Sequence, residues 1–323
     1  MNKNKTFIIA EIGINHDGNL LKAKKLIFLA KKGGADAVKF QLFSPGDLYL
    51  KNDKNYNSAK KFSLNKKDIL KLRNYSKKIK IKFFCTPFSK DKAEYLNEIK
   101  TDGYKIASMD SLNINLIRKC LSYNKPVIIS TGMLNLKEHN YIFNKFKGKK
   151  NIYFLHCIST YPTPNNKTGL NVLDFFKKKL GKNSIYGYSD HSINTNNVKI
   201  AIAKGARIIE KHFTLFKRNK YDHIHSMNFE DLKSIVEFSK LFHSYRIKKD
   251  FLKNRIDSKN AKIYRRGIYT KEKIKKNEKL ELNKLNFVRP QKSSHYLDLS
   301  MIKNKKAKKN LKKNTLITIS KIF

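Results

Sequence analysis

The sequence predicts a closed parallel barrel of eight strand–helix pairs, followed by a small C-terminal unit. Short runs rich in β-branched and aromatic residues alternate with amphipathic segments through the first 245 residues. Eight such runs occur there, and this number and this length match a (β/α)8, or TIM, barrel. A doubly wound open sheet is the main alternative.

The elements follow in chain order. The predicted strands are TFIIAEI (6–12), ADAVKFQLF (35–43), KIKFFCTPF (80–88), GYKIAS (103–108), KPVIIST (125–131), NIYFLHCI (151–158), SIYGYS (184–189) and ARIIEKHF (206–213). Between them, segments such as 19–34 carry apolar residues at helical spacing and end in glycine, where a C-cap belongs. The last predicted helix, 228–242, starts at Asn228 as its N-cap and has acidic residues in its first turn.

The chain divides into a barrel over 1–245, a lysine-rich linker over 246–261 and a small unit over 262–323. We expect a cytoplasmic protein, because no apolar run reaches the length of a membrane helix and the N-terminal run is too short for a signal peptide. The cysteines, Cys85, Cys120 and Cys157, are odd in number and lie far apart, which favours reduced, buried thiols.

The net charge of +46 raises the hypothesis of nucleic-acid binding. Of the 71 basic residues only nine are Arg, although the guanidinium is the group favoured for bidentate phosphate and base contacts. The lysines are spread over almost every predicted helix. We therefore expect a solvated lysine surface and no nucleic-acid partner, with a field that attracts anionic small molecules.

Polar residues stand at the C-terminal ends of the predicted strands, which is where such barrels build their active sites. They are Glu11, Lys39, Gln41, Thr86, Lys105, Ser108, Ser130, Thr131, His156, Ser159, Tyr161, Ser189, His191, Glu210 and His212. Burying an unpaired charge is costly, so the acids and lysines among them imply mutual pairing, a metal or a charged ligand.

His191 and His212 would lie at the same end of adjacent strands, where two neutral imidazoles can bind one divalent ion such as Mn, Co, Fe or Zn. For His156, inside an apolar run, a structural role is equally favoured. Lys39 and Lys105 would either form salt bridges with the two glutamates or bind a phosphate, helped by the nearby hydroxyl groups.

Eight motifs in this order resemble the sialic acid synthase family, and the resemblance extends through essentially the whole chain. The motifs are IIAEIGINHDG, AVKFQ, CTPFS, YKIAS, VIISTGM, LHCISTYPTP, GYSDHS and IEKHFT. The resemblance implies condensation of phosphoenolpyruvate with open-chain N-acetylmannosamine and water to give N-acetylneuraminate and phosphate, with C–O cleavage. It also implies a divalent metal, Mn²⁺ or Mg²⁺, bound by His191 and His212, that activates the aldehyde.

The same resemblance implies roles for further residues. Glu11 matches the acid beside the developing charge at C2. Positions that match the phosphoenolpyruvate site are Lys39, Thr86, Lys105, Ser108, Ser130 and Ser189. Positions that match the amino-sugar pocket are Gln41, Asp110, Tyr161, Asp222 and Arg289. The C-terminal unit resembles an antifreeze-like (SAF) domain, which implies a domain-swapped homodimer in which Arg289 reaches the partner's sugar site.

Two departures from the family pattern concern the sugar side. QKSSHY follows Arg289-Pro290 where a glycine-bearing turn is usual, and Lys220-Tyr221 precede Asp222 where Gly-Pro is frequent. A legionaminic or pseudaminic acid synthase is therefore an alternative, although EIGINH is closer to the sialic and legionaminic branches. A Schiff-base aldolase with Lys39 or Lys105 as nucleophile is a more distant alternative.

Overall fold

The computed structural model describes residues 5–181, 183–245, 258–291 and 298–323. The chain divides into two compact units, Met1–Arg246 and Ile247–Phe323. Most of the predicted linker lies outside the described residues, and helix α11 begins at Ser258 within its last part.

The N-terminal unit contains a closed barrel of eight parallel strands in sequential order, in which β1 also pairs with β8. The strands are β1 (Phe7–Glu11), β2 (Ala37–Leu42), β3 (Lys82–Pro87), β4 (Gly103–Ile106), β5 (Val127–Ser130), β6 (Ile152–Cys157), β7 (Tyr186–Asp190) and β8 (Ile208–His212). Seven of the eight lie within their predicted runs, and β7 extends one residue beyond its run, to Asp190. The barrel prediction is therefore confirmed, and the open-sheet alternative is wrong because the edges pair with each other.

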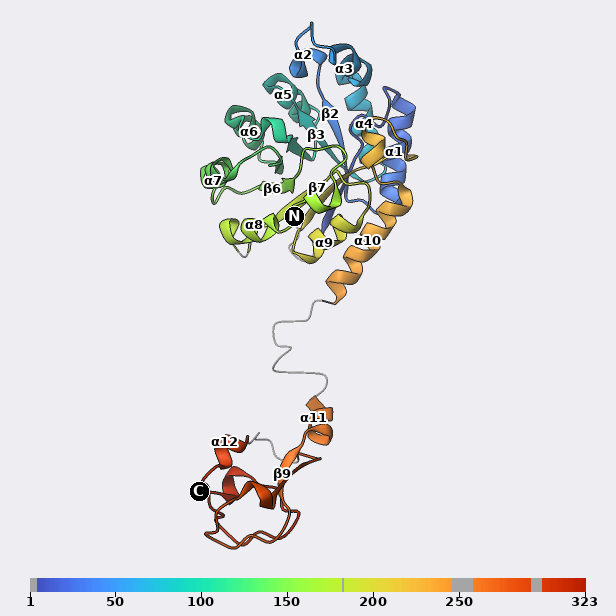
Figure 1. Cartoon of the computed structure of the whole chain (residues 1–323). Helices are drawn as coiled ribbons and strands as arrows, with labels where there is room; N and C mark the ends of the chain where they lie inside the picture. The colour runs from blue at the N-terminus through green and yellow to red at the C-terminus, as the bar shows by residue number, and fades with distance from the viewer. Residues whose placement is uncertain (1–4, 182, 246–257, 292–297) are drawn as a thin grey trace. The chain divides into compact units, whose positions relative to one another are not determined.

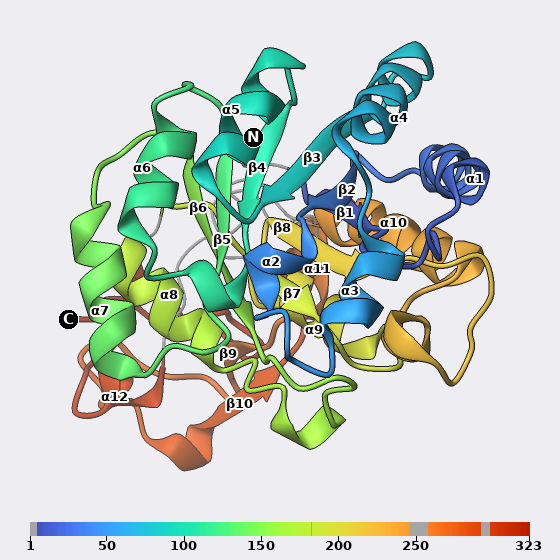
Figure 2. The same cartoon turned by 90° about the horizontal axis from the view of Figure 1, so that it is seen from above.

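Helices surround the barrel on its outer side (Figures 1 and 2). They are α1 (Leu20–Lys32), α2 (Pro45–Leu48), α3 (Tyr56–Phe62), α4 (Lys66–Lys78), α5 (Lys90–Glu98), α6 (Ile114–Leu121), α7 (Leu136–Lys145), α8 (Val172–Leu180), α9 (Asn196–Ala203) and α10 (Phe229–Ser244). Short 3-10 turns are η1 (Ser108–Asp110), η2 (Asn165–Lys167) and η3 (Tyr221–His225). The predicted cap of the last helix is confirmed, because the Asn228 side chain accepts a hydrogen bond from the Asp231 amide at 2.9 Å.

The interior of the barrel is built in layers, because strand side chains alternate between its two faces. One layer is apolar and contains Ile9, Ala37, Phe84, Ile128, Leu155 and Ile208. Two residues further along the same strands stand Glu11, Lys39, Thr86, Ser130, Cys157 and Glu210. A layer of polar and charged groups therefore lies directly above a layer of hydrocarbon.

The outward faces of the strands pack against the helices in the main apolar core. His156 belongs to this face: its Nε2 lies 2.7 Å from the Thr168 carbonyl oxygen, and its ring stacks on Tyr188 at 5.7 Å between centroids. Of the two roles weighed for His156, the structural one fits this position.

The C-terminal unit has its own apolar core, formed by Ile268, Ile274, Leu280, Leu285, Ile302, Ala307, Leu311, Ile317 and Ile322. Its elements are α11 (Ser258–Tyr264), β9 (Gly267–Thr270), η4 (Leu282–Lys284), β10 (Leu285–Val288), α12 (Leu299–Ile302) and η5 (Ile319–Lys321), with β9 and β10 antiparallel. Its antifreeze-like character stays a prediction.

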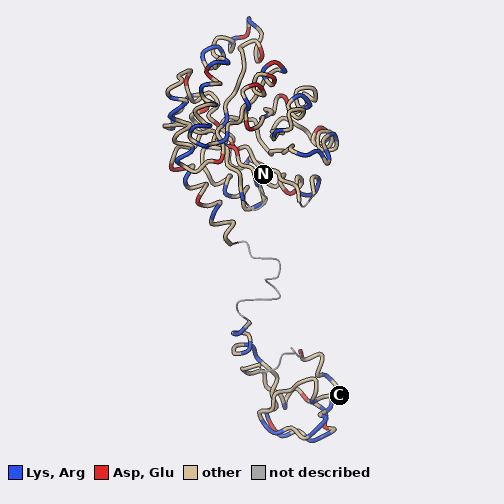
Figure 3. Tube along the Cα trace, turned by 180° about the vertical axis from the view of Figure 1, so that it is seen from behind, with Lys and Arg blue, Asp and Glu red and all other residues tan. Residues whose placement is uncertain are grey.

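The basic residues lie along the helices of the barrel and along the C-terminal unit, as Figure 3 shows. Within the described ranges, no helix is both long enough and apolar enough to cross a lipid bilayer.

Candidate active site

Two carboxylates and two ammonium groups meet inside the barrel in the layer above the hydrocarbon. The Lys39 Nζ lies 2.9 Å from the Glu11 Oε2 and 3.8 Å from the Glu210 Oε2. The Lys105 Nζ lies 3.6 Å from the Glu210 Oε1. All four side chains are buried, so their charges are stabilised by each other more than by water.

Neutral polar groups border these charges. The Lys105 ammonium donates to the Ser130 hydroxyl at 2.7 Å, and the Lys39 ammonium donates to the Thr86 hydroxyl at 3.3 Å. The Ser189 hydroxyl donates to Glu210 at 3.0 Å. The Gln41 amide donates to the Glu11 Oε1 at 3.0 Å, which holds this carboxylate from the side opposite Lys39.

Burial and mutual charge shift the pKa values of these groups in different directions. Burial, supported by repulsion from Glu210, raises the pKa of Glu11 to about 7 although Lys39 opposes it. Burial also acts on Glu210, but Lys105 and Lys39 outweigh it and hold its pKa below the usual value. Burial lowers the pKa of Lys105. One acid of the layer therefore titrates near neutrality while the other stays ionised.

A corner beside this layer is kept open by a glycine. The Gly132 amide donates to the Ser108 hydroxyl at 3.1 Å. A Cβ atom at Gly132 would lie 2.6 Å from the Ser159 Oγ and 3.0 Å from both the Cys157 Sγ and the Ser108 Oγ. Residue 132 therefore has no room for a side chain unless these groups move.

The two predicted metal ligands lie at the ends of neighbouring strands, as expected. His191 follows β7, and its Nδ1 must donate to the Ile158 carbonyl oxygen at 2.9 Å, because a carbonyl can only accept. In the neutral ring this hydrogen bond places the lone pair on Nε2, the arrangement usual for a histidine ligand. The rings of His191 and His212 are 5.5 Å apart between centroids.

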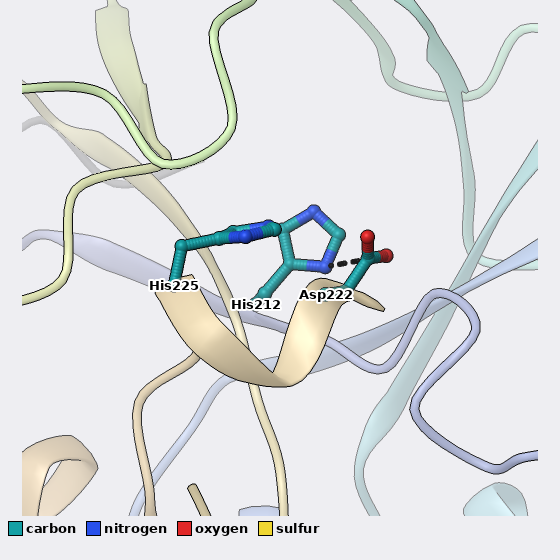
Figure 4. Close-up of side chains that lie close together, drawn as sticks. All are labelled: His212, Asp222 and His225. Atoms are coloured by element: carbon teal, nitrogen blue, oxygen red, sulfur yellow. Dashed lines mark ion pairs between the residues drawn. The ribbon is translucent and has the colours of Figure 1, made fainter. Parts of the chain in front are cut away.

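The turn η3 adds two more groups to this pair. The Asp222 Oδ2 lies 3.3 Å from the His212 Nδ1, and the His225 ring lies 4.7 Å from the His212 ring between centroids (Figure 4). One ligand atom each from His212, Asp222 and His225 lies within 4.8 Å of the others, so this group could hold a metal ion. Burial lowers the pKa of His225 to about 3 and that of His212 well below its usual value, so both rings are neutral.

Gly13 separates the charged layer from the histidines. Its φ is +50°, in the left-handed region that favours glycine. A Cβ atom there would lie 3.1 Å from the Glu11 Oε1, 3.2 Å from the His212 Cε1 and 3.3 Å from the Asp222 Oδ2. The absence of a side chain keeps open the space between the carboxylate and the imidazole.

The structure brings most of the predicted site residues together at one end of the barrel, including Tyr161, whose ring lies 4.2 Å from that of His191 between centroids. Asp110 is the last residue of η1, two residues after Ser108, and accepts a hydrogen bond from Asn113 at 3.4 Å. Arg289 belongs to the C-terminal unit, where its guanidinium lies 5.4 Å from the Tyr264 ring centroid. The segment QKSSHY begins at Gln291, and its other residues lie outside the described part of the chain.

Sequence reasoning missed His225, Gly13 and Gly132. For His225 a signal was present: DHIH places two histidines within three residues after Asp222, in a polar segment that follows the last strand. The two glycines could be recognised only from the groups that surround them in space.

These features define a class of protein, a (β/α)8 barrel enzyme whose buried charges and histidines share the C-terminal ends of its strands. The NeuB family model matches residues 26–247, and the chain belongs to the NeuB family of synthases.

Similar proteins cover nearly the whole chain. It is 34% identical over 334 residues to an N,N'-diacetyllegionaminic acid synthase of Campylobacter jejuni, covering 97% of this chain and 99% of the relative. It is also 34% identical to a pseudaminic acid synthase of that organism, covering 95% of this chain and 94% of the relative. A crystal structure of a sialic acid synthetase from Leptospira borgpetersenii in complex with citrate has a TM-score of 0.73 at 32% identity, covering 80% of this chain and 93% of that one.

Proposed function

We propose that the protein condenses phosphoenolpyruvate with open-chain N-acetylmannosamine and water to give N-acetylneuraminate and phosphate. The observation that carries the proposal is the buried layer of two lysines and two glutamates beside the histidines. In the reaction C3 of phosphoenolpyruvate bonds to the aldehyde carbon, water adds at C2, and the C–O bond to phosphate breaks.

The lysines bind the anionic substrate. Lys39 and Lys105 are the charged donors of the layer, and the Thr86 and Ser130 hydroxyls are already within hydrogen-bond distance of them. Ser108 and Ser189 complete the proposed phosphoenolpyruvate site. Ammonium and hydroxyl donors in a buried setting suit the carboxylate and phosphate of this substrate.

Glu11 acts beside C2. Its carboxylate is held by Lys39 and Gln41, and its pKa of about 7 lets it stabilise positive charge when ionised or exchange a proton with the added water. A divalent metal, Mn²⁺ or Mg²⁺, bound by His191 and His212 would polarise the sugar aldehyde as a Lewis acid. The lone pair that the Ile158 hydrogen bond leaves on the His191 Nε2 fits such a ligand role.

The acceptor sugar is the finer part of the proposal. Gln41, Asp110, Tyr161 and Asp222 are proposed to line its pocket, and Arg289 is proposed to reach it from a partner subunit in a domain-swapped homodimer. A legionaminic or pseudaminic acid synthase would use the same reaction with another acetamido sugar, and relatives with both names are equally similar to this chain.

The test is phosphate release from phosphoenolpyruvate with a panel of acetamido sugars, with and without added manganese. We expect release to require both a sugar and the metal, and to be greatest with N-acetylmannosamine. A higher rate with a 2,4-diacetamido sugar would identify that sugar as the acceptor. The proposed reaction type would then stand, and N-acetylmannosamine would be excluded as the preferred substrate. Absence of release with every sugar and metal would overturn the proposal.

A Schiff-base aldolase is the second candidate, and the lowered pKa of Lys105, caused by burial, is the observation that favours it. It predicts that borohydride traps a covalent adduct in the presence of substrate and that a chelator leaves activity intact. The synthase predicts no adduct and a loss of activity with chelator.

Replacing Gly132 with alanine should weaken phosphoenolpyruvate binding about tenfold or more, because the methyl group would enter the corner formed by Ser108, Cys157 and Ser159. Overpacking of this kind costs ~1–3 kcal/mol. Calorimetric titration with phosphoenolpyruvate measures the effect. Gly46→Ala is the matched control, because a Cβ there meets nothing within 4 Å. Equal affinities in the two variants would show that the corner does not bind the substrate.

Replacing Arg289 with alanine should raise the KM for the amino sugar about tenfold or more and leave the KM for phosphoenolpyruvate within about twofold. A charged hydrogen bond to a ligand contributes ~1.5–3 kcal/mol, which sets this scale. Steady-state kinetics with each substrate varied in turn gives both values. Lys279→Ala, an exposed residue of the same unit, is the control. Unchanged kinetics in the Arg289 variant would exclude it from the sugar site.

A further inference from the structure

We propose that His225 is a third imidazole ligand of the metal site at His191 and His212, so that the site selects a nitrogen-preferring transition ion such as Zn²⁺, Co²⁺ or Fe²⁺ over Mg²⁺. The inference rests on the proposed function, because it concerns the metal that this function requires.

The three rings are spaced as ligands of one ion. The centroids are 4.7 Å apart for His212 and His225, 5.5 Å for His191 and His212, and 5.7 Å for His191 and His225. With metal–nitrogen bonds of ~2 Å and tetrahedral angles, the ring centres of two imidazoles on one ion lie about 5 Å apart. The rings of each pair are therefore close to that spacing. Ligand atoms of His212, Asp222 and His225 already lie within 4.8 Å of one another, and the His191 ring would turn toward an ion that these groups share.

The second observation is that the nitrogens of His225 are buried and unpaired. Only 1% of the residue is exposed, and within the described residues neither ring nitrogen has a hydrogen-bond partner. A neutral imidazole carries one donor and one acceptor, and leaving both unmatched in the interior costs free energy. A bound ion would satisfy one nitrogen directly.

His223, two residues earlier in the same turn, shows the contrast. Its Nδ1 lies 2.6 Å from the Thr214 Oγ1, and its Nε2 lies 3.3 Å from the Asp17 Oδ1. The turn therefore carries one histidine with both nitrogens bound by the protein and one with neither, and the unbound one is the one that faces His191 and His212.

Aromatic packing alone does not explain why residue 225 is a histidine. The His225 ring is edge-on to those of His191, His212 and Tyr161, which is a favourable arrangement. An apolar ring such as phenylalanine would pack equally well and would leave no polar nitrogen buried. The packing therefore accounts for the ring and leaves its two nitrogens unexplained.

The ligand set determines the ion. Three imidazoles, with the Asp222 carboxylate 3.3 Å from His212, form a nitrogen-rich set that suits Zn²⁺, Co²⁺ or Fe²⁺. Mg²⁺ prefers six oxygen ligands in octahedral geometry. We therefore expect Zn²⁺ and Co²⁺ to bind this chain far more tightly than Mg²⁺ does.

The experiment uses full-length protein stripped of metal with a chelator and then titrated with Co²⁺, followed by visible absorption and by competition with a chromophoric chelator. We expect His225→Leu to weaken Co²⁺ binding at least tenfold and to change the absorption bands. His223→Gln, the control from the same turn, should keep the affinity within about twofold. Unchanged affinity and spectrum in His225→Leu would overturn the proposal.

X-ray absorption of the unmodified, Zn²⁺-loaded protein gives an answer even if the variant does not fold. Three imidazoles in the first coordination shell are expected, and two would overturn the proposal. The result is independent of turnover: three imidazoles in a protein that releases no phosphate would overturn the proposed function alone. Two imidazoles in an active synthase would overturn this inference alone.

Discussion

Replacing Asp190 with asparagine is expected to destabilise the barrel by ~3–5 kcal/mol, because it leaves a buried lysine without its counter-charge. The Lys211 Nζ lies 2.5 Å from the Asp190 Oδ2, and both side chains are 0% exposed. Lys211 also donates a hydrogen bond to the Ser192 carbonyl oxygen at 2.6 Å. The Asp190→Asn variant would keep this hydrogen bond, but the carbonyl carries no negative charge to balance the ammonium group. Thermal unfolding should show a fall in Tm of about 10 °C for a domain of this size.

The pH dependence of the loss identifies its cause. Burial lowers the pKa of Lys211 although Asp190 opposes it, and removing Asp190 should lower this pKa further. A folded-state pKa below the unfolded-state pKa means that the folded protein binds fewer protons, so stability rises with pH in that window. The deficit of Asp190→Asn should therefore shrink as the pH rises toward the usual pKa of lysine.

A second variant tests the pairing itself. Asp190→Asn combined with Lys211→Met removes both charges, and this double variant should recover most of the lost stability, because a neutral buried pair has no unpaired charge. Losses that simply add in the double variant would show that the two side chains do not stabilise each other. A loss in Asp190→Asn that stays constant with pH would exclude the protonation of Lys211 as its cause.

This ion pair also shows where sequence reasoning ends. The barrel could be predicted because apolar runs of strand length recur between amphipathic segments, and this pattern depends only on local alternation. From the sequence, the polar residues at the strand ends could be assigned to an active site only as a group, without knowing which side chains pair with each other. Asp190 and Lys211 are adjacent to His191 and His212 in the chain, yet they form a buried pair of their own on the outward face of the strands.

Strand periodicity explains why the sequence indicates the charged residues inside the barrel but does not indicate His225. Glu11, Lys39 and Lys105 could be identified because period-two alternation places them two residues beyond small or apolar positions of the same strands. His225 lies in a 3-10 turn outside any strand, where no periodicity indicates which side chains face inward. Its position depends on how η3 folds back over the end of β8, which is a tertiary property.

Replacing Glu11 with glutamine is expected to lower turnover by ~10²–10⁴-fold, the range usual for loss of a positioned acid or base. In the unmodified protein, kcat/KM for phosphoenolpyruvate should fall as the pH drops through about 7, because Glu11 then gains a proton and loses the charge that the proposed mechanism assigns to it. The variant should lack this acidic limb and keep any limb that arises from the substrate. Glu98→Gln, an exposed acid, is the control.

Stability should respond to the same group with a definite sign. The folded-state pKa of Glu11, about 7, lies above its ordinary value of 4.5, so the folded protein binds the extra proton between these two values. The free energy of unfolding should therefore fall as the pH rises through that window, and this fall should be smaller in Glu11→Gln. An unaltered pH–rate profile together with an unaltered pH–stability profile in the variant would remove Glu11 from both roles, and the charge at C2 would need another partner in the layer, of which Glu210 is the remaining acid.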